Sequence, residues 1–276
     1  MIARQKRFID LCERIERGEF ILGTGCSTAS PVSMEILGYN GFDFVICDTE
    51  VLMVNPETLE NMIRAAEATG TIPMVKLKSN SPQGIQDALN AGAPAIKVPH
   101  VTCANDLRHA MDSTFFAPKG HRGLCPVSRA NQYAQGRMSD LIEWTNEYAM
   151  VIPIIEDREA IENIDEIMAV EGVQVYDVGP VDLAHSYGLP PDLGFSNPEI
   201  DDALVRVLES AKKYGKKVMT TPFFGANLPA SGPNSLQELV NERLVKRGVQ
   251  LIFYRSDASL MREGVRQAFA LKDLYK

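Results

Sequence analysis

Two acidic residues stand where apolar runs end, and their positions predict a metal site. Glu156 closes the run VIPIIE, and Asp182 follows Pro180 in the turn GPVDL. A carboxylate carried toward an apolar interior is costly without a cation, and neighbouring carboxylates repel unless they share a proton or a metal ion. Hard oxygen ligands without a nearby set of cysteines or histidines favour Mg²⁺ or Mn²⁺. The alternatives to a metal site are structural: Glu156 could be a surface carboxylate that caps the next helix, and Asp182 could be a helix N-cap.

Other charged residues end further apolar runs. Asp48 and Glu50 end the second run, Lys76 lies in the third, and Arg255 ends the eighth. The two acids could position a water molecule, while the lysine could stabilise developing negative charge. Lys76 or Lys97 could instead act as the nucleophile of a Schiff-base mechanism, because burial makes a lysine amine easier to deprotonate. Arg255 could bind a substrate carboxylate or form an ion pair with a neighbouring acid.

The elements that must position these residues alternate regularly. Eight short apolar runs are separated by amphipathic stretches, many of which begin with a capping or turn residue and end with glycine. The runs are 20–25, 43–48, 73–78, 95–99, 150–156, 173–178, 217–222 and 251–255. Such alternation predicts a parallel α/β sheet, and eight units closing on themselves form a (βα)8 TIM barrel. An open doubly wound sheet would show the same alternation, although no GxGxxG follows the first run.

In a (βα)8 barrel the active site lies at the carboxyl ends of the strands, where these charged residues occur. Two connections depart from the regular pattern. The segment 115–133 is long and rich in glycine, proline and arginine, and its Arg122 could bind an anionic substrate or hold a subunit interface. The segment 223–235 is expected to be a mobile rim loop. His100, after the fourth run, is expected to have a structural rather than a catalytic role.

Length and composition bound the class of protein. The 276 residues carry 36 acidic and 28 basic side chains, a formal net charge of -8. This balance argues against nucleic acid or an anionic membrane as the main partner. No apolar stretch is long enough to span a membrane, and the polar start is unlike a signal peptide. Nothing marks a domain boundary, so we expect one domain over 1–276, in the cytosol.

Nearly the whole chain resembles the HpcH/HpaI aldolase family, the class II pyruvate aldolases. The segments that carry the resemblance are GFDFVICDTE at 41–50, NAGAPAIKVPHV at 90–101, PKGHRG at 118–123, IIEDREAIENIDEI at 154–167 and VYDVGPVDLAHSYG at 175–188. The last two resemble the family's metal-glutamate and metal-aspartate segments, and in this order they form a fairly specific pair.

The resemblance implies a barrel of the phosphoenolpyruvate/pyruvate type whose Mg²⁺ or Mn²⁺ is held by Glu156 and Asp182. A pyruvate-like 2-oxo acid would chelate the metal, with its carboxylate at the turn formed by Gly179, Pro180 and Val181. The metal would stabilise an enolate as a carbon–carbon bond forms or breaks. Family members are usually homohexamers, trimers of dimers with an exchanged last helix, and the PKGHRG loop would approach a neighbouring site.

Several positions depart from the family pattern. Val51 stands where the family has a histidine that works with an aspartate in acid/base catalysis. Lys76 stands where the family has an arginine that steadies the enolate oxygen, and a lysine lacks the bidentate fork of arginine. Ile154 replaces a glutamine and Asn90 an aspartate. The metal and 2-oxo acid platform remains, whereas the usual proton relay for aldol cleavage is missing.

These observations lead to a predicted function. We expect a metal-dependent carbon–carbon lyase or synthase acting through the enolate of pyruvate or a related 2-oxo acid, with Lys76, Asp48 and Glu50 as catalytic residues. Decarboxylation of oxaloacetate, or an enolate condensation, would need no such proton relay. A Schiff-base aldolase and a catalytically lapsed barrel that binds a keto acid as a sensor or carrier are also compatible with the sequence.

Overall fold

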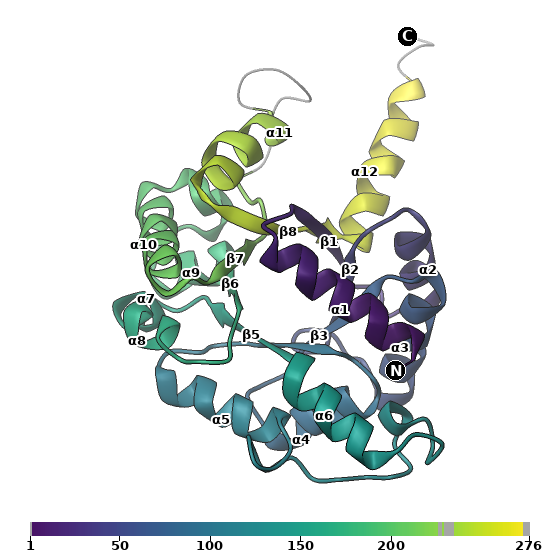
Figure 1. Cartoon of the computed structure of the whole chain (residues 1–276). Helices are drawn as coiled ribbons and strands as arrows, with labels where there is room; N and C mark the ends of the chain where they lie inside the picture. Colours follow the sequence, from purple (N-terminus) through teal and green to yellow (C-terminus); the bar gives the residue numbers. More distant parts are fainter. Residues whose placement is uncertain (1, 226–227, 229–234, 273–276) are drawn as a thin grey trace.

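The strands form one closed parallel barrel (Figure 1). The structure, a computed structural model, describes residues 2–225, 228 and 235–272. Neighbours follow the chain order, and β8 pairs with β1 to close the ring. The strands are β1 Ile21–Cys26, β2 Phe44–Asp48, β3 Ile72–Lys76, β4 Ala95–Val98, β5 Met150–Ile155, β6 Val175–Val178, β7 Lys217–Thr220 and β8 Val249–Ser256. The predicted (βα)8 barrel is confirmed, and the open sheet is wrong because no edge remains between β8 and β1.

Helices cover the outside of the barrel (Figure 1). The α-helices are α1 Ala3–Glu16, α2 Pro31–Tyr39, α3 Pro56–Thr69, α4 Pro82–Asn90, α5 Ala104–Thr114, α6 Met138–Tyr148, α7 Arg158–Glu162, α8 Ile164–Met168, α9 Pro180–Ser186, α10 Pro198–Tyr214, α11 Leu236–Leu239 and α12 Asp257–Ala270. Shorter helical segments are η1 Arg129–Asn131, η2 Pro191–Ser196, η3 Val240–Leu244 and η4 Val245–Arg247. Within the described ranges, each helix is too short or too polar to cross a lipid bilayer.

The helix boundaries follow the signals in the sequence. Ser30, Asn55 and Ser81 each accept a hydrogen bond from a first-turn amide, and proline follows each of them. Gly70 ends α3 with a φ of 89°, a left-handed conformation that glycine adopts without strain. These local signals explain why the sequence predicts the alternation of strands and helices.

The apolar core has two parts, one on each side of the strands. The larger part lies between the barrel and its surrounding helices. The smaller part lies inside the barrel, where Phe8, Leu11 and Ile15 of α1 pack with strand residues such as Phe44 and Leu251. Since α1 packs into the inner core at the amino end of the barrel, the opposite end, at the carboxyl ends of the strands, is where a cavity can form.

Of the two irregular connections, the structure describes 115–133 in full and 223–235 only in part. The segment 115–133 contains η1 and leads into α6, which lies beside α1, with the rings of Phe8 and Trp144 6.0 Å apart. This unit therefore adds a helix before β5. The expected rim loop at 223–235 lies largely outside the described residues.

The last helix, α12, stands away from the barrel (Figure 1). Asp257 anchors its start by accepting a hydrogen bond from the backbone N–H of Ser27 at 2.7 Å. Further along, Met261, Val265 and Phe269 are exposed, and their four-residue spacing places them on one face. This face makes α12 suited to packing against a surface other than its own barrel.

Candidate active site

The carboxyl ends of the strands surround a cavity of about 190 Å³. Its lining includes residues from the ends of four strands, and the sequence had already singled out these residues. They are Asp48, Lys76, Glu156, Gly179, Pro180, Val181 and Asp182. Glu50 joins this group by an ion pair between its carboxylate and the amine of Lys76. The fold therefore brings together residues that are more than a hundred positions apart in the chain.

Glu156 is the buried acid of the cavity. It follows β5, its residue exposure is 2%, and its Oε1 accepts a hydrogen bond from the backbone N–H of His100 at 3.1 Å. Burial raises the pKa of Glu156 to about 7; the charge of Lys76 opposes this rise, and the charge of Asp182 adds to it. Gly179 allows the close approach, since a Cβ there would lie 2.9 Å from Oε2 of Glu156. The positive charge of Lys76 therefore offsets only part of the cost of burying the carboxylate of Glu156.

Asp182 lies in the first turn of α9 and is exposed. The N-cap of α9 is Gly179, so the N-cap role considered for Asp182 is wrong. Its carboxylate shares the cavity with Glu156 and acts on the pKa of that residue through its charge. Asp182 is thus available to a ligand from the solvent side.

Lys76 ends β3 and is partly buried beside acidic groups. Burial alone would lower the pKa of Lys76, but the negative charges of Glu156, Glu50 and Asp48 outweigh burial and raise that pKa above its usual value. A nucleophilic lysine needs the opposite shift, because only the neutral amine attacks a carbonyl. Lys76 is therefore suited to stabilising negative charge.

Asp48 shapes the turn after β2. Its Oδ1 accepts hydrogen bonds from the backbone N–H groups of Glu50 at 2.9 Å and Val51 at 3.3 Å. These bonds hold the carboxylate of Glu50 toward Lys76. Val51 itself is exposed and offers no group that transfers a proton.

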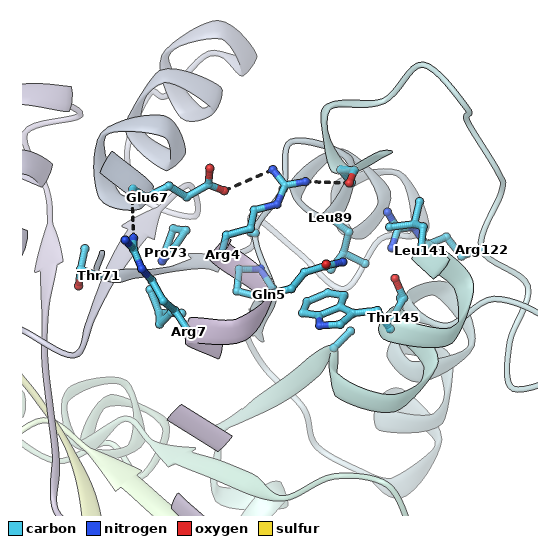
Figure 2. Close-up of a pocket in the computed structure, with 17 residues that line it drawn as sticks. Arg4, Gln5, Arg7, Glu67, Thr71, Pro73, Leu89, Arg122, Leu141 and Thr145 are labelled. Atoms are coloured by element: carbon cyan, nitrogen blue, oxygen red, sulfur yellow. Dashed lines mark hydrogen bonds and ion pairs between the residues drawn. The ribbon is translucent and has the colours of Figure 1, made fainter. Parts of the chain in front are cut away.

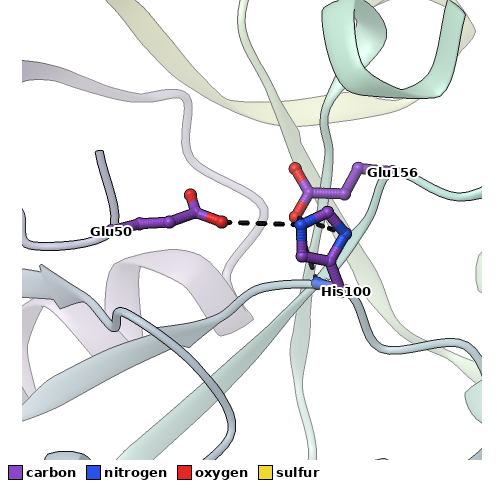
Figure 3. A group of neighbouring side chains, drawn as sticks. All are labelled: Glu50, His100 and Glu156. Carbon is purple, nitrogen blue, oxygen red and sulfur yellow. Dashed lines mark hydrogen bonds and ion pairs between the residues drawn. The ribbon is translucent and has the colours of Figure 1, made fainter. Parts of the chain in front are cut away.

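His100 lies closer to the acids than the sequence indicated. Glu50, His100 and Glu156 each offer one atom that could bind a metal ion, and these three atoms lie within 4.8 Å of one another (Figure 3). Nδ1 of His100 is 2.9 Å from Asp157 Oδ2, and Nε2 is 3.6 Å from Glu50 Oε1. Burial alone would lower the pKa of His100, but the hydrogen bond to Asp157 and the nearby acids raise it. The strand-end rule pointed to this histidine, but its neighbours across the barrel could not be read from the chain.

A buried ion pair lies deeper in the cavity. Nζ of Lys97 is 2.7 Å from Oδ2 of Asp177, and the two side chains are 2% and 6% exposed. Asp177 pairs in register with Ile154, two residues before Glu156, and the ring of Phe253 lies 5.1 Å from Nζ of Lys97. Sequence reasoning did not assign this pair. The amine of Lys97 is thus held by Asp177.

Two arginines that were considered for substrate binding, each with a structural alternative, do not line this cavity. Arg255 forms an ion pair with Glu263 of α12, and Arg122 lines a separate cavity beside α6. Both lie outside the lining of the cavity at the strand ends. For Arg255, the ion pair with a neighbouring acid is the arrangement observed.

The raised pKa of Glu156 predicts how the stability of the metal-free protein depends on pH. The pKa is about 7 in the folded chain against an ordinary value of 4.5. Between these values the folded state binds more protons than the unfolded state, so the free energy of unfolding falls as pH rises. The total effect is on the order of 3 kcal/mol.

Thermal unfolding with a chelator present, from about pH 5 to about pH 8, measures this effect. The wild-type melting temperature should fall relative to that of Glu156→Gln as pH rises. Glu159→Gln, which changes an exposed acid three residues away, should follow the wild type. Parallel curves for the wild type and Glu156→Gln would contradict the prediction.

The fold and the site define a (βα)8 barrel with an acidic pocket at its carboxyl end. Residues 26–231 match the sequence model of the HpcH/HpaI aldolase/citrate lyase family. The chain belongs to this family of pyruvate or 2-oxo acid aldolases and related lyases.

Individual relatives support this assignment. The chain is 33% identical over 196 residues to 5-keto-4-deoxy-D-glucarate aldolase of Klebsiella pneumoniae subsp. pneumoniae, covering 71% of this chain and 75% of that protein. A crystal structure of citrate synthase SbnG is 28% identical, with a TM-score of 0.79 over 95% of this chain and 97% of that one. A family protein from Burkholderia cenocepacia is 26% identical, with a TM-score of 0.84 over 97% and 99%.

Proposed function

We propose that the protein is a divalent-metal-dependent carbon–carbon lyase or synthase that acts through the enolate of pyruvate or a related 2-oxo acid. The observation that carries the proposal is Glu156, a carboxylate with 2% exposure in a cavity shared with Lys76 and Asp182. Similarity to an aldolase and to a citrate synthase supports cleavage and condensation as the two directions of such chemistry.

The residues present fit a hard divalent cation. Glu156 is only partly neutralised by Lys76, and Asp182 adds a second carboxylate to the same cavity. In this proposal these two acids hold Mg²⁺ or Mn²⁺, for which carboxylate oxygen is a preferred donor. When bound, the ion supplies Lewis-acid stabilisation of charge on the substrate's keto oxygen.

Residues of the chain perform the remaining tasks. The first-turn amides of α9, at Val181 and Asp182, have no partner within their own helix and are placed to bind the substrate carboxylate. Lys76 stays protonated beside its acidic neighbours and stabilises negative charge as the enolate develops. Asp48 and Glu50 position a water molecule in place of the absent histidine.

A Schiff-base mechanism receives no support from the lysines. Lys76 is paired with Glu50, and Lys97 is paired with Asp177. Each amine would have to leave an ion pair and lose its proton before it could attack a carbonyl.

A second candidate function is decarboxylation of oxaloacetate or condensation of its enolate with an electrophile. The observation that favours it is Val51, which provides no proton-transfer group at the rim of the site. Both reactions use the same metal and 2-oxo acid platform without the usual aldol base.

We also infer that the protein is a homo-oligomer, a hexamer arranged as a trimer of dimers. The exposed apolar face of α12 formed by Met261, Val265 and Phe269 supports this inference, since the helix stands away from its own barrel. In the proposed assembly this helix packs against a second copy.

Hydrogen exchange at C3 of pyruvate tests the proposed function. Incubation in D₂O with Mg²⁺ or Mn²⁺, followed by mass spectrometry of the pyruvate, should show enzyme-dependent exchange. A chelator should reduce the rate at least about a hundredfold, and excess metal should restore it. Full exchange in the metal-free protein would contradict the proposal.

Companion assays on the same samples separate the competing reactions. Carbon dioxide release from oxaloacetate without pyruvate exchange would identify the decarboxylase. A covalent adduct trapped by borohydride would identify a Schiff base. Metal-dependent pyruvate binding with neither exchange nor decarboxylation would identify a catalytically lapsed barrel.

A further inference from the structure

His100 lies beside the buried acid of the catalytic cavity, and the proposed reaction gives its ring no task. It follows β4, and its side chain is 60% exposed. Its backbone N–H donates to Oε1 of Glu156 at 3.1 Å, which fixes the residue next to a proposed metal ligand. The carboxylates of Glu50 and Glu156 both face the ring (Figure 3). The ring is therefore open to solvent and lies among acids.

The two nitrogens of this ring have different partners. Nδ1 lies 2.9 Å from Oδ2 of Asp157, and because a carboxylate only accepts hydrogen bonds, Nδ1 is the nitrogen that carries the hydrogen. In the neutral ring the lone pair is then on Nε2. A carboxylate that fixes the tautomer in this way is the usual companion of a histidine that binds a metal ion. Asp157 thus prepares Nε2 to act as a ligand.

Nε2 faces an acid. It lies 3.6 Å from Oε1 of Glu50, whose other oxygen pairs with the amine of Lys76. One atom each of Glu50, His100 and Glu156 lies within 4.8 Å of the other two. Two ligand atoms that are each about 2.1 Å from one ion are roughly 3–4 Å apart, so side-chain movements of about 1 Å bring these atoms to a shared ion.

A nitrogen ligand changes which ions a site prefers. Carboxylates alone suit Mg²⁺, whereas imidazole favours transition metals such as Co²⁺ and Zn²⁺. We propose that Nε2 of His100 is a further ligand of the ion held by Glu156 and Asp182, and that Asp157 positions the ring for this role. This inference rests on the proposed function, because it adds a ligand to the same ion.

A second cavity, beside α6, is unsuited to a cation (Figure 2). Arg4, Arg7 and Arg122 line it, and Glu67 is the one acid among its described lining residues. Glu67 already accepts hydrogen bonds from Arg129 and lies 3.6 Å from Nη1 of Arg4. The positive charge around this cavity repels a metal ion, so a metal titration reports on the acidic site at the strand ends.

Electron paramagnetic resonance of bound Mn²⁺ tests whether His100 is a ligand. The full chain is prepared without a histidine tag and loaded with one equivalent of Mn²⁺, and pulsed spectra record the coupling to ¹⁴N. The wild type should show the coupling of a directly bound nitrogen. His100→Gln, which offers an oxygen instead, should lack it. A wild-type spectrum without this coupling would overturn the proposal and leave His100 as an ion-pair partner of Glu50.

Metal affinity gives a second readout. His100→Gln should weaken Co²⁺ binding at least about tenfold and Mg²⁺ binding less than about threefold, because only Co²⁺ gains strongly from a nitrogen ligand. Asp157→Asn should weaken Co²⁺ binding about tenfold, since the ring loses the carboxylate that orients it. Calorimetric titration measures both affinities. Unchanged Co²⁺ binding in His100→Gln would overturn the proposal.

His121 and Asp112 are the matched control pair. Nδ1 of His121 lies 2.6 Å from Oδ1 of Asp112, and the two side chains are 87% and 50% exposed. His121→Gln and Asp112→Asn should leave the spectra and both affinities unchanged. A chain that binds neither ion would overturn the proposed function together with this inference. Metal binding that depends on Glu156 but shows no nitrogen coupling would overturn this inference alone.

Discussion

Glu156→Gln is expected to reduce metal-dependent exchange of the pyruvate C3 hydrogens about a thousandfold. The variant loses a charged metal ligand, which should remove about 4 kcal/mol of transition-state stabilisation, and each 1.4 kcal/mol corresponds to a factor of ten in rate. Glutamine has the same shape and keeps an oxygen for the backbone N–H of His100. It cannot supply the negative charge that faces Lys76 and, in the proposed function, the metal. The exchange rate at saturating metal measures the loss of catalysis, and the dissociation constant of Mn²⁺ measures the loss of metal affinity.

Glu159→Gln is the matched control for this loss. Glu159 is an exposed acid in the first turn of α7, three residues after Glu156, and its replacement should leave exchange unchanged. Exchange by Glu156→Gln at close to the wild-type rate would remove Glu156 from the proposed metal site, even if the protein remained metal-dependent.

Removing one member of the buried pair between Lys97 and Asp177 is expected to be the most damaging change to stability. Lys97→Met leaves Asp177 as an unpaired charge at 6% exposure, which should lower the free energy of unfolding by about 3–5 kcal/mol. Asp177→Asn leaves Lys97 in the same position and should cost a similar amount. Urea titration measures these losses, and the dependence of the unfolding free energy on urea concentration should stay unchanged.

The double variant separates charge from packing. Lys97→Met with Asp177→Leu removes both charges and should recover most of the stability lost by either single change. The control pair is Lys213 and Asp165, which has the same 2.7 Å separation but side chains that are 58% and 56% exposed. Breaking it should cost much less than breaking the buried pair, because exposed ion pairs contribute little to stability. Equal losses at the two pairs would show that burial does not set the cost.

The fold was predictable because its signals are local. Each strand is a short apolar run, and the prolines, capping residues and glycines that bound the helices act on their own neighbourhood. Once the barrel is inferred, the rule that ligands bind at the carboxyl ends of strands selects Asp48, Lys76, Glu156 and Asp182 without knowledge of any distance.

The pairings within the site could not be predicted in the same way. Lys97 meets Asp177 across the barrel, 80 positions along the chain, and Arg122 meets Asn90 across 32 positions. A sequence shows that a residue ends a strand but not which side chain faces it. For the same reason the sequence leaves open whether Arg255 binds a substrate carboxylate or pairs with a neighbouring acid, and the structure shows an ion pair with Glu263 on α12.

The projecting helix α12 has a consequence for how this protein behaves on dilution. Under the proposed assembly, the apolar face formed by Met261, Val265 and Phe269 is removed from water only when another copy is present. Subunit association then contributes to stability by mass action, so a dilute sample should unfold more readily than a concentrated one. The amount of the protein that a cell makes would thus help to set how long each copy stays folded.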